Sequence, residues 1–253
     1  MRKPGTPEPV EVRPACHGDE PSRSLLAATH GLIERTYGAR SGVSDLAPFI
    51  IGDGGYRRFF LGDSVVGRLG GETAEEAPRV PAGPRVLVRD LPGGPTALAI
   101  YFPDALIKHL EEAPPTLGLD GDNVDDFASF VEEIDHFIVL AHGIRTGKSL
   151  NLLALETRAN ISKALVLFHF IGRLSGRTRL LREERLWTRH HLFEKVVFIE
   201  GDPLVRRRYE EARRLAVRLL DRLEQLPLSR RLKELRRWNQ LSPQQMLLDL
   251  DSA

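Results

Sequence analysis

The sequence lacks the features that most often disclose a protein's function. Its 253 residues include one cysteine, Cys16, so no internal disulfide and no site built from several thiolates can form. No stretch approaches the roughly 20 uninterrupted apolar residues of a membrane span. Segment 1–24 has no apolar core of the kind that a secretory signal requires. We therefore expect a cytoplasmic protein that does not enter a membrane.

Several common enzyme motifs are also missing. The chain has no G-x-S-x-G nucleophile elbow, no H-E-x-x-H zinc motif and no glycine pattern for dinucleotides. Segment 142–149 resembles a P-loop, but the first glycine of that motif falls on His142. The apolar residues before it continue a helical pattern, and too few strands follow to form the required parallel sheet. We favour a connection between two helices there.

Net charge is almost absent, although charge is unevenly distributed. The chain has 36 basic and 35 acidic residues, a formal balance of +1, which gives no bulk attraction for polyanions. Segment 104–135 carries ten acidic residues against one basic residue, whereas segment 173–237 carries nineteen basic against ten acidic. The two segments either neutralise each other within the fold or present separate faces to partners.

The pattern of apolar residues predicts a mainly helical α+β fold. The proline-rich residues 1–21 form a disordered tail, and residues 22–102 form a small α/β portion. Two β-rich runs around Pro92-Gly-Gly-Pro95 predict a hairpin near 85–102, whose strands must pair with the preceding loop or lie against helices. Residues 103–253 then form a helical bundle, with helices expected over about 104–112, 122–142, 149–171, 179–194, 203–226 and 229–239.

A candidate metal site lies in the helix expected over 122–142. Glu133 and His136 are three residues apart, so they share a helix face and can bind one ion, as Glu-x-x-His pairs do in carboxylate-bridged iron bundles. The sequence has no second Glu-x-x-His, and Glu156 on the next helix is the candidate third ligand, for iron or zinc. His169 lies about 20 Å from Glu156 along that helix, too far to join it. The alternative is that Glu133 and His136 form a solvated helix face.

A second candidate is a basic stripe near the C-terminus. Four arginines fall close to one line on the helix that follows Pro203, and such a stripe could contact nucleic-acid phosphates without reading sequence. Acidic residues are interleaved with it, so ion pairs within the chain are the alternative. The stripe consists of Arg207, Arg214, Arg218 and Arg222.

The sequence does not decide whether the protein is an enzyme. Because no complete catalytic set is present, we expect a soluble, non-catalytic interaction or regulatory module that acts on a protein partner. The first alternative is a metal-dependent helical enzyme that uses Glu133, His136 and Glu156. The second is a nucleic-acid-associated protein that uses the arginine stripe.

Overall fold

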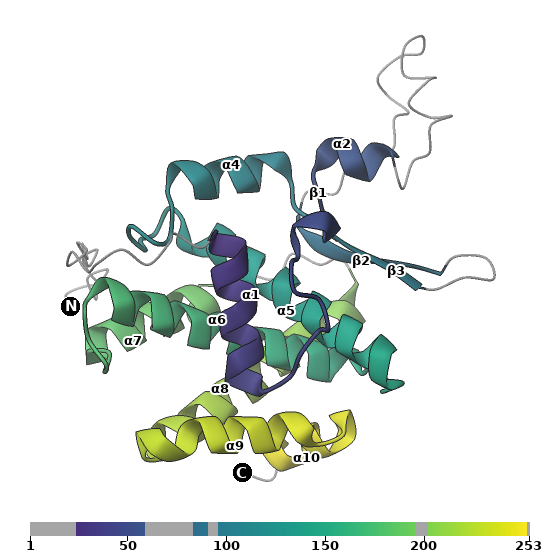
Figure 1. Cartoon of the computed structure of the whole chain (residues 1–253). Helices are drawn as coiled ribbons and strands as arrows, with labels where there is room; N and C mark the ends of the chain where they lie inside the picture. Colours follow the sequence, from purple (N-terminus) through teal and green to yellow (C-terminus); the bar gives the residue numbers. More distant parts are fainter. Residues whose placement is uncertain (1–23, 59–82, 91–95, 196–201, 252–253) are drawn as a thin grey trace.

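The computed structural model describes residues 24–58, 83–90, 96–195 and 202–251. These residues are mainly helical and include a small three-stranded sheet, which confirms the predicted fold class (Figure 1). The tail predicted at 1–21 and the hairpin turn at 92–95 lie outside the described residues. The division of the chain at residue 102 stays a prediction.

The N-terminal part begins with helix α1, Leu25–Tyr37. The hydroxyl of Ser24 accepts a hydrogen bond from the backbone N–H of Ala27 and caps the helix start. Gly38 ends the helix with φ 65°, a conformation that glycine adopts without steric cost. The chain then forms a 3-10 turn, strand β1 and the short helix α2, which span Ala47–Phe49, Ile50–Ile51 and Asp53–Tyr56.

The sheet has the strand order β1-β3-β2. Strands β2, Arg85–Asp90, and β3, Thr96–Tyr101, pair antiparallel, as the hairpin prediction requires. Strand β1 pairs parallel with the other edge of β3, so the sheet is completed by residues that precede the loop expected from Gly52 onward. Buried Ile100 and Phe102 belong to the same apolar core as residues of the helices.

The remaining helices follow the sequence pattern closely. Residues 137–141 lie inside helix α5, and Gly147 ends that helix, so the P-loop interpretation of 142–149 is wrong. No helix in the described part of the chain is long and apolar enough to cross a membrane. The helices are α4 Asp104–Glu112, α5 Val124–Thr146, α6 Leu152–Leu174, α7 Arg182–Arg189 with a π turn at His190–Glu194, α8 Pro203–Gln225, α9 Leu228–Gln240 and α10 Pro243–Asp251.

Helices α5 and α6 form the centre of the molecule. Helix α6 packs against α5 and α8, while α5 is also covered by α1, α4 and the sheet. Apolar side chains alone do not fill the contact between α5 and α6, since charged residues of both helices are buried there. Charged groups removed from water need partners, so their pairing decides how the two helices fit together.

One buried polar network fastens α5 to α6. Asp135 Oδ1 on α5 accepts hydrogen bonds from Arg158 Nε at 3.2 Å and from the Ser162 hydroxyl at 2.9 Å, both on α6. The Arg158 guanidinium lies 4.1 Å from the ring centroid of Tyr37 and donates to Asn239 at 2.8 Å. Helices α1, α5, α6 and α9 therefore meet at one charged pair.

We expect Asp135→Ala to lower the free energy of unfolding by about 3–5 kcal/mol, because it leaves the buried Arg158 guanidinium without its carboxylate. Urea denaturation followed by circular dichroism measures this loss. The double variant Asp135→Ala/Arg158→Met removes both charges and is expected to recover much of it. A loss below about 1 kcal/mol for the single variant would contradict the role of this pair.

Candidate metal centre

Three potential metal ligands converge between α5 and α6. One donor atom from each of Glu132, His136 and Glu156 lies within 4.8 Å of the others. Glu132 and His136 are four residues apart and lie on one face of α5, while Glu156 lies in the second turn of α6. Packing of the two helices therefore assembles a set of two carboxylates and one imidazole.

The predicted residues are buried rather than solvated. The exposed fractions are 8% for Glu133, 9% for His136 and 6% for Glu156. The alternative that Glu133 and His136 form a solvated face is therefore wrong. It assumed that one side of α5 is open to solvent, whereas helices and strands cover α5 on several sides.

The imidazole of His136 lies between two carboxylates. Its Nδ1 is 3.6 Å from Glu133 Oε2, and its Nε2 is 3.6 Å from Glu156 Oε2. Both distances exceed the roughly 3.2 Å limit of a good N–H···O hydrogen bond. Neither His136 Nε2 nor Glu156 Oε2 has a hydrogen-bond partner within the described residues, although both atoms are buried.

This spacing suits two ligands of one ion. Donors at 2.0–2.1 Å from a tetrahedral zinc ion lie about 3.4 Å from each other. Imidazole and carboxylate together favour zinc, iron or manganese over the hard cations calcium and magnesium. These two buried donor atoms, which lack hydrogen-bond partners within the described residues, therefore fit a transition metal.

Glu132 differs from the other two potential ligands because a lysine contacts it. Lys163 Nζ on α6 donates to Glu132 Oε2 at 2.6 Å. Burial alone would raise the pKa of Glu132, but the charges of Lys163 and His136 outweigh burial and lower it. Glu132 is therefore ionised at neutral pH.

Negative charge also controls the protonation of His136. Burial alone would lower the pKa of the imidazole, but Glu133, Glu156 and Glu132 outweigh it and raise the pKa well above the ordinary value. With His136 protonated, Lys163 and His136 leave one of the three carboxylate charges uncompensated. A divalent ion that replaces the imidazolium proton would balance these five side chains.

The structure adds one candidate ligand that the sequence analysis did not single out. Glu132 joins the cluster, whereas Glu133 faces the opposite nitrogen of the imidazole. The sequence held a signal for Glu132, since residues four apart share a helix face as well as residues three apart do. His169, which the sequence analysis places too far from Glu156 to join it, is not part of the cluster and lines a separate cavity.

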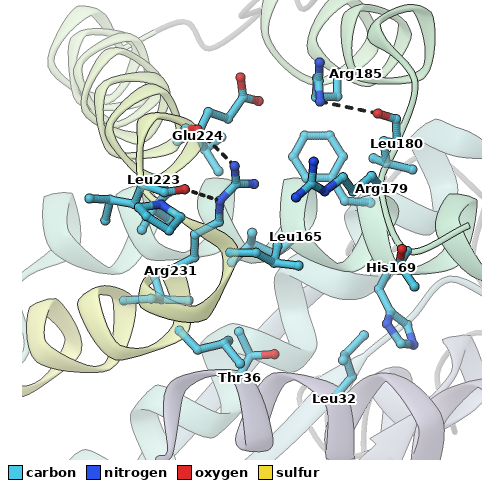
Figure 2. Close-up of a pocket in the computed structure, with 18 residues that line it drawn as sticks. Leu32, Thr36, Leu165, His169, Arg179, Leu180, Arg185, Leu223, Glu224 and Arg231 are labelled. Atoms are coloured by element: carbon cyan, nitrogen blue, oxygen red, sulfur yellow. Dashed lines mark hydrogen bonds between the residues drawn. The ribbon is translucent and has the colours of Figure 1, made fainter.

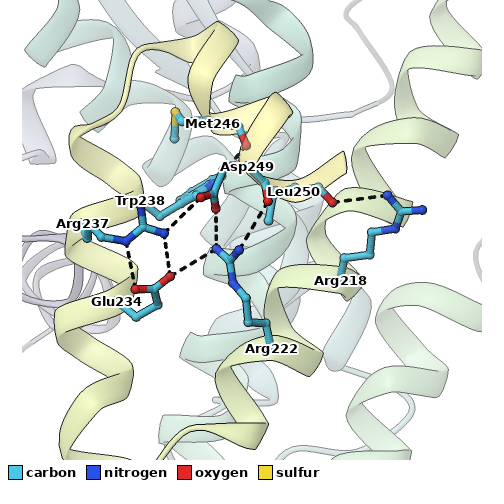
Figure 3. A network of polar contacts seen from close by, with 8 residues as sticks. All are labelled: Arg218, Arg222, Glu234, Arg237, Trp238, Met246, Asp249 and Leu250. Atoms are coloured by element: carbon cyan, nitrogen blue, oxygen red, sulfur yellow. Dashed lines mark hydrogen bonds and ion pairs between the residues drawn. The ribbon is translucent and has the colours of Figure 1, made fainter. Parts of the chain in front are cut away.

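The arginine stripe is largely engaged within the chain. Arg222 forms ion pairs with Asp249 and Glu234, and Arg218 donates to the carbonyl of Leu250 (Figure 3). Arg214 pairs with Glu211 on the same helix. Arg237 joins the same network through Glu234 and Asp249, so these arginines fasten α8, α9 and α10 together. Arg207 stays exposed on α8.

Comparison with protein-family models, with curated proteins and with solved structures finds no match to this chain. The candidate site therefore stands on its geometry and chemistry alone.

We expect chelator-treated protein to lose stability as pH rises above about 6.5, the ordinary pKa of histidine. A raised pKa means that the folded chain holds the His136 proton more tightly than the unfolded chain does. The contribution is thus complete below that pH and is lost as pH rises through the folded-state pKa. Urea unfolding between pH 6 and 10 measures it.

The matched variant for this experiment is His136→Gln, because all other titrating groups are shared with the wild type. The difference in unfolding free energy between the two proteins should shrink as pH rises. A difference that is independent of pH would show that the carboxylates do not stabilise the protonated imidazole of His136.

Proposed function

We propose that this protein is a metal-binding helical module in which Glu132, His136 and Glu156 hold one divalent transition-metal ion between α5 and α6. The observation that carries the proposal is the pair of buried donor atoms His136 Nε2 and Glu156 Oε2, which lie 3.6 Å apart and have no hydrogen-bond partner within the described residues. The third donor comes from Glu132. Zinc and iron are the ions that this donor set favours.

Glu133 is proposed to orient the imidazole rather than to bind the ion. Metal-bound histidines commonly donate their second ring N–H to a carboxylate, which fixes the tautomer and strengthens the ligand. Glu133 Oε2 faces Nδ1 of His136, the nitrogen opposite the one that faces Glu156. This role replaces the direct ligation that the Glu-x-x-His spacing predicts for Glu133.

The ion would link two central helices of the molecule. Since its ligands come from α5 and α6, binding would stabilise the folded chain. At a free metal concentration about one hundred times Kd, the free energy of unfolding would rise by about 2.7 kcal/mol. This effect suits a regulatory module, the role expected from the sequence. We propose no reaction at this site.

The nucleic-acid hypothesis has less support than metal binding. Three of the four stripe residues already contact groups within the chain, namely Arg214, Arg218 and Arg222. Binding to phosphates would have to compete with these contacts. Nucleic acid and a protein partner both stay predictions from the sequence.

Isothermal titration of the chelator-treated chain with Zn²⁺, and anaerobically with Fe²⁺, tests the proposal. We expect one ion per chain and a higher melting temperature. His136→Gln and Glu156→Gln should each weaken binding by about 100-fold or more, because each removes a direct ligand. Glu111→Gln is the matched control, since Glu111 is an exposed carboxylate on α4. Equal binding by the wild type and Glu156→Gln would overturn the proposal.

The two roles assigned to Glu132 and Glu133 predict different losses. Glu133→Gln should weaken metal binding by about 10- to 100-fold without changing the stoichiometry, as expected for a residue behind the ligand. Glu132→Gln should remove a ligand and change the metal environment seen by X-ray absorption. If Glu133→Gln changes that environment and Glu132→Gln does not, the assignment of the two residues is reversed.

A further inference from the structure

A cavity of about 670 Å³ lies away from the metal centre, where α1, α6, α8 and α9 meet the segment before α7 (Figure 2). This volume falls within the range of small-molecule sites. Its walls are mainly aliphatic and come from helices far apart in sequence. They include Leu32, Leu165, Phe168, Leu220, Leu228 and Leu232.

Two of the arginines that line the cavity are positioned by backbone carbonyls. Arg231 donates to the carbonyls of Leu226 at 3.1 Å and Glu224 at 2.9 Å, and Arg185 donates to the carbonyl of Leu180 at 3.3 Å. A carbonyl orients a guanidinium but does not neutralise its charge. Each guanidinium has five N–H donors, so further donors stay available to a ligand.

Arg179 is the third arginine of the cavity, and it is exposed to solvent. Within the described residues, neither Arg179 nor Arg185 nor Arg231 forms an ion pair with a carboxylate. In contrast, Arg189 on the neighbouring helix α7 pairs with Asp221. Figure 2 shows the three guanidinium groups on one side of the cavity, with Leu32 and Thr36 on the other.

The cavity therefore carries a net positive charge. Glu224 is the carboxylate among its lining residues, against three arginines. His169 adds no charge at neutral pH, because burial and the nearby Arg173 and Arg35 lower its pKa. Aliphatic walls with unneutralised guanidinium groups on one side are complementary to a molecule with an apolar body and an anionic end.

We propose that this cavity binds an aliphatic chain that carries a carboxylate or phosphate headgroup. The leucine walls remove the chain from water, and the arginines donate charge-assisted hydrogen bonds to the headgroup. Aliphatic rather than aromatic ligands fit best because leucine dominates the walls. The site shares no residue with the metal centre, so either proposal can fail without the other.

Isothermal titration of the full chain with dodecanoate and dodecyl phosphate, each below its micellar concentration, and with dodecanol below its solubility limit, tests the proposal. We expect one anion per chain, and dodecanol should bind at least about tenfold more weakly because it lacks the charge. The two anions distinguish a carboxylate site from a phosphate site. Decanoate should bind roughly tenfold more weakly than dodecanoate, since it buries two fewer methylenes.

Substitutions of lining residues test whether the ligand binds in this cavity. Arg179→Ala should weaken binding about tenfold by removing a charged donor. Leu228→Asp should abolish binding, and it should fold because Leu228 is 55% exposed. The control is Arg182→Ala, an exposed arginine on α7 outside the cavity. Circular dichroism checks that each variant is folded.

Three results would overturn the proposal. The first is no binding of either anion to the wild type, and the second is binding of several anions per chain, which indicates adsorption. The third is equal affinity of the wild type, Arg179→Ala and Leu228→Asp, which would place the ligand elsewhere.

Discussion

The structure depends on how charged side chains are paired between α5 and α6. Removing an ionised group from water costs several kcal/mol, and only a well-placed partner offsets that cost. Asp135 and Arg158 provide such a pair, and contacts to Ser162 and Asn239 hold it in place. His136 follows Asp135 directly on α5, and Glu156 lies two residues before Arg158 on α6. The pair that fixes the helix register therefore also fixes the distance between the donor atoms of the candidate metal centre.

The two proposed sites share α6 but differ in their electrostatics. Glu156 and Lys163 of α6 belong to a region where carboxylates predominate, whereas Leu165 and His169 of the same helix line a cavity with three arginines. The opposite charge of the two regions favours different ligands, a divalent cation at one and an aliphatic anion at the other. The long central helix thus contributes to both sites while it packs against α5 and α8.

Much of the helical architecture could be predicted because it follows from local chemistry. Asp202 caps α8 through the backbone N–H of Leu204, and Ser242 and Gln245 form the reciprocal cap that starts α10. The alternation of apolar residues gave the two hairpin strands. Burial around α5 was less predictable. His136 lies off the main apolar stripe, and only the presence of several neighbouring elements shows that this face is covered too.

The sequence by itself determined the helices, the hairpin and the nearness of His136 to acidic groups on its own helix, because each depends on residues a few positions apart. Tertiary structure decided that Glu132 rather than Glu133 shares a centre with Glu156, since this depends on the rotation of α5 against α6. It also decided which arginines are neutralised. Arg222 on α8 forms an ion pair with Asp249 on α10, whereas Arg179, Arg185 and Arg231 line a cavity whose walls are mainly leucine. Charge spacing along a chain cannot show these differences, because partners for long side chains come from whichever helix packs beside them.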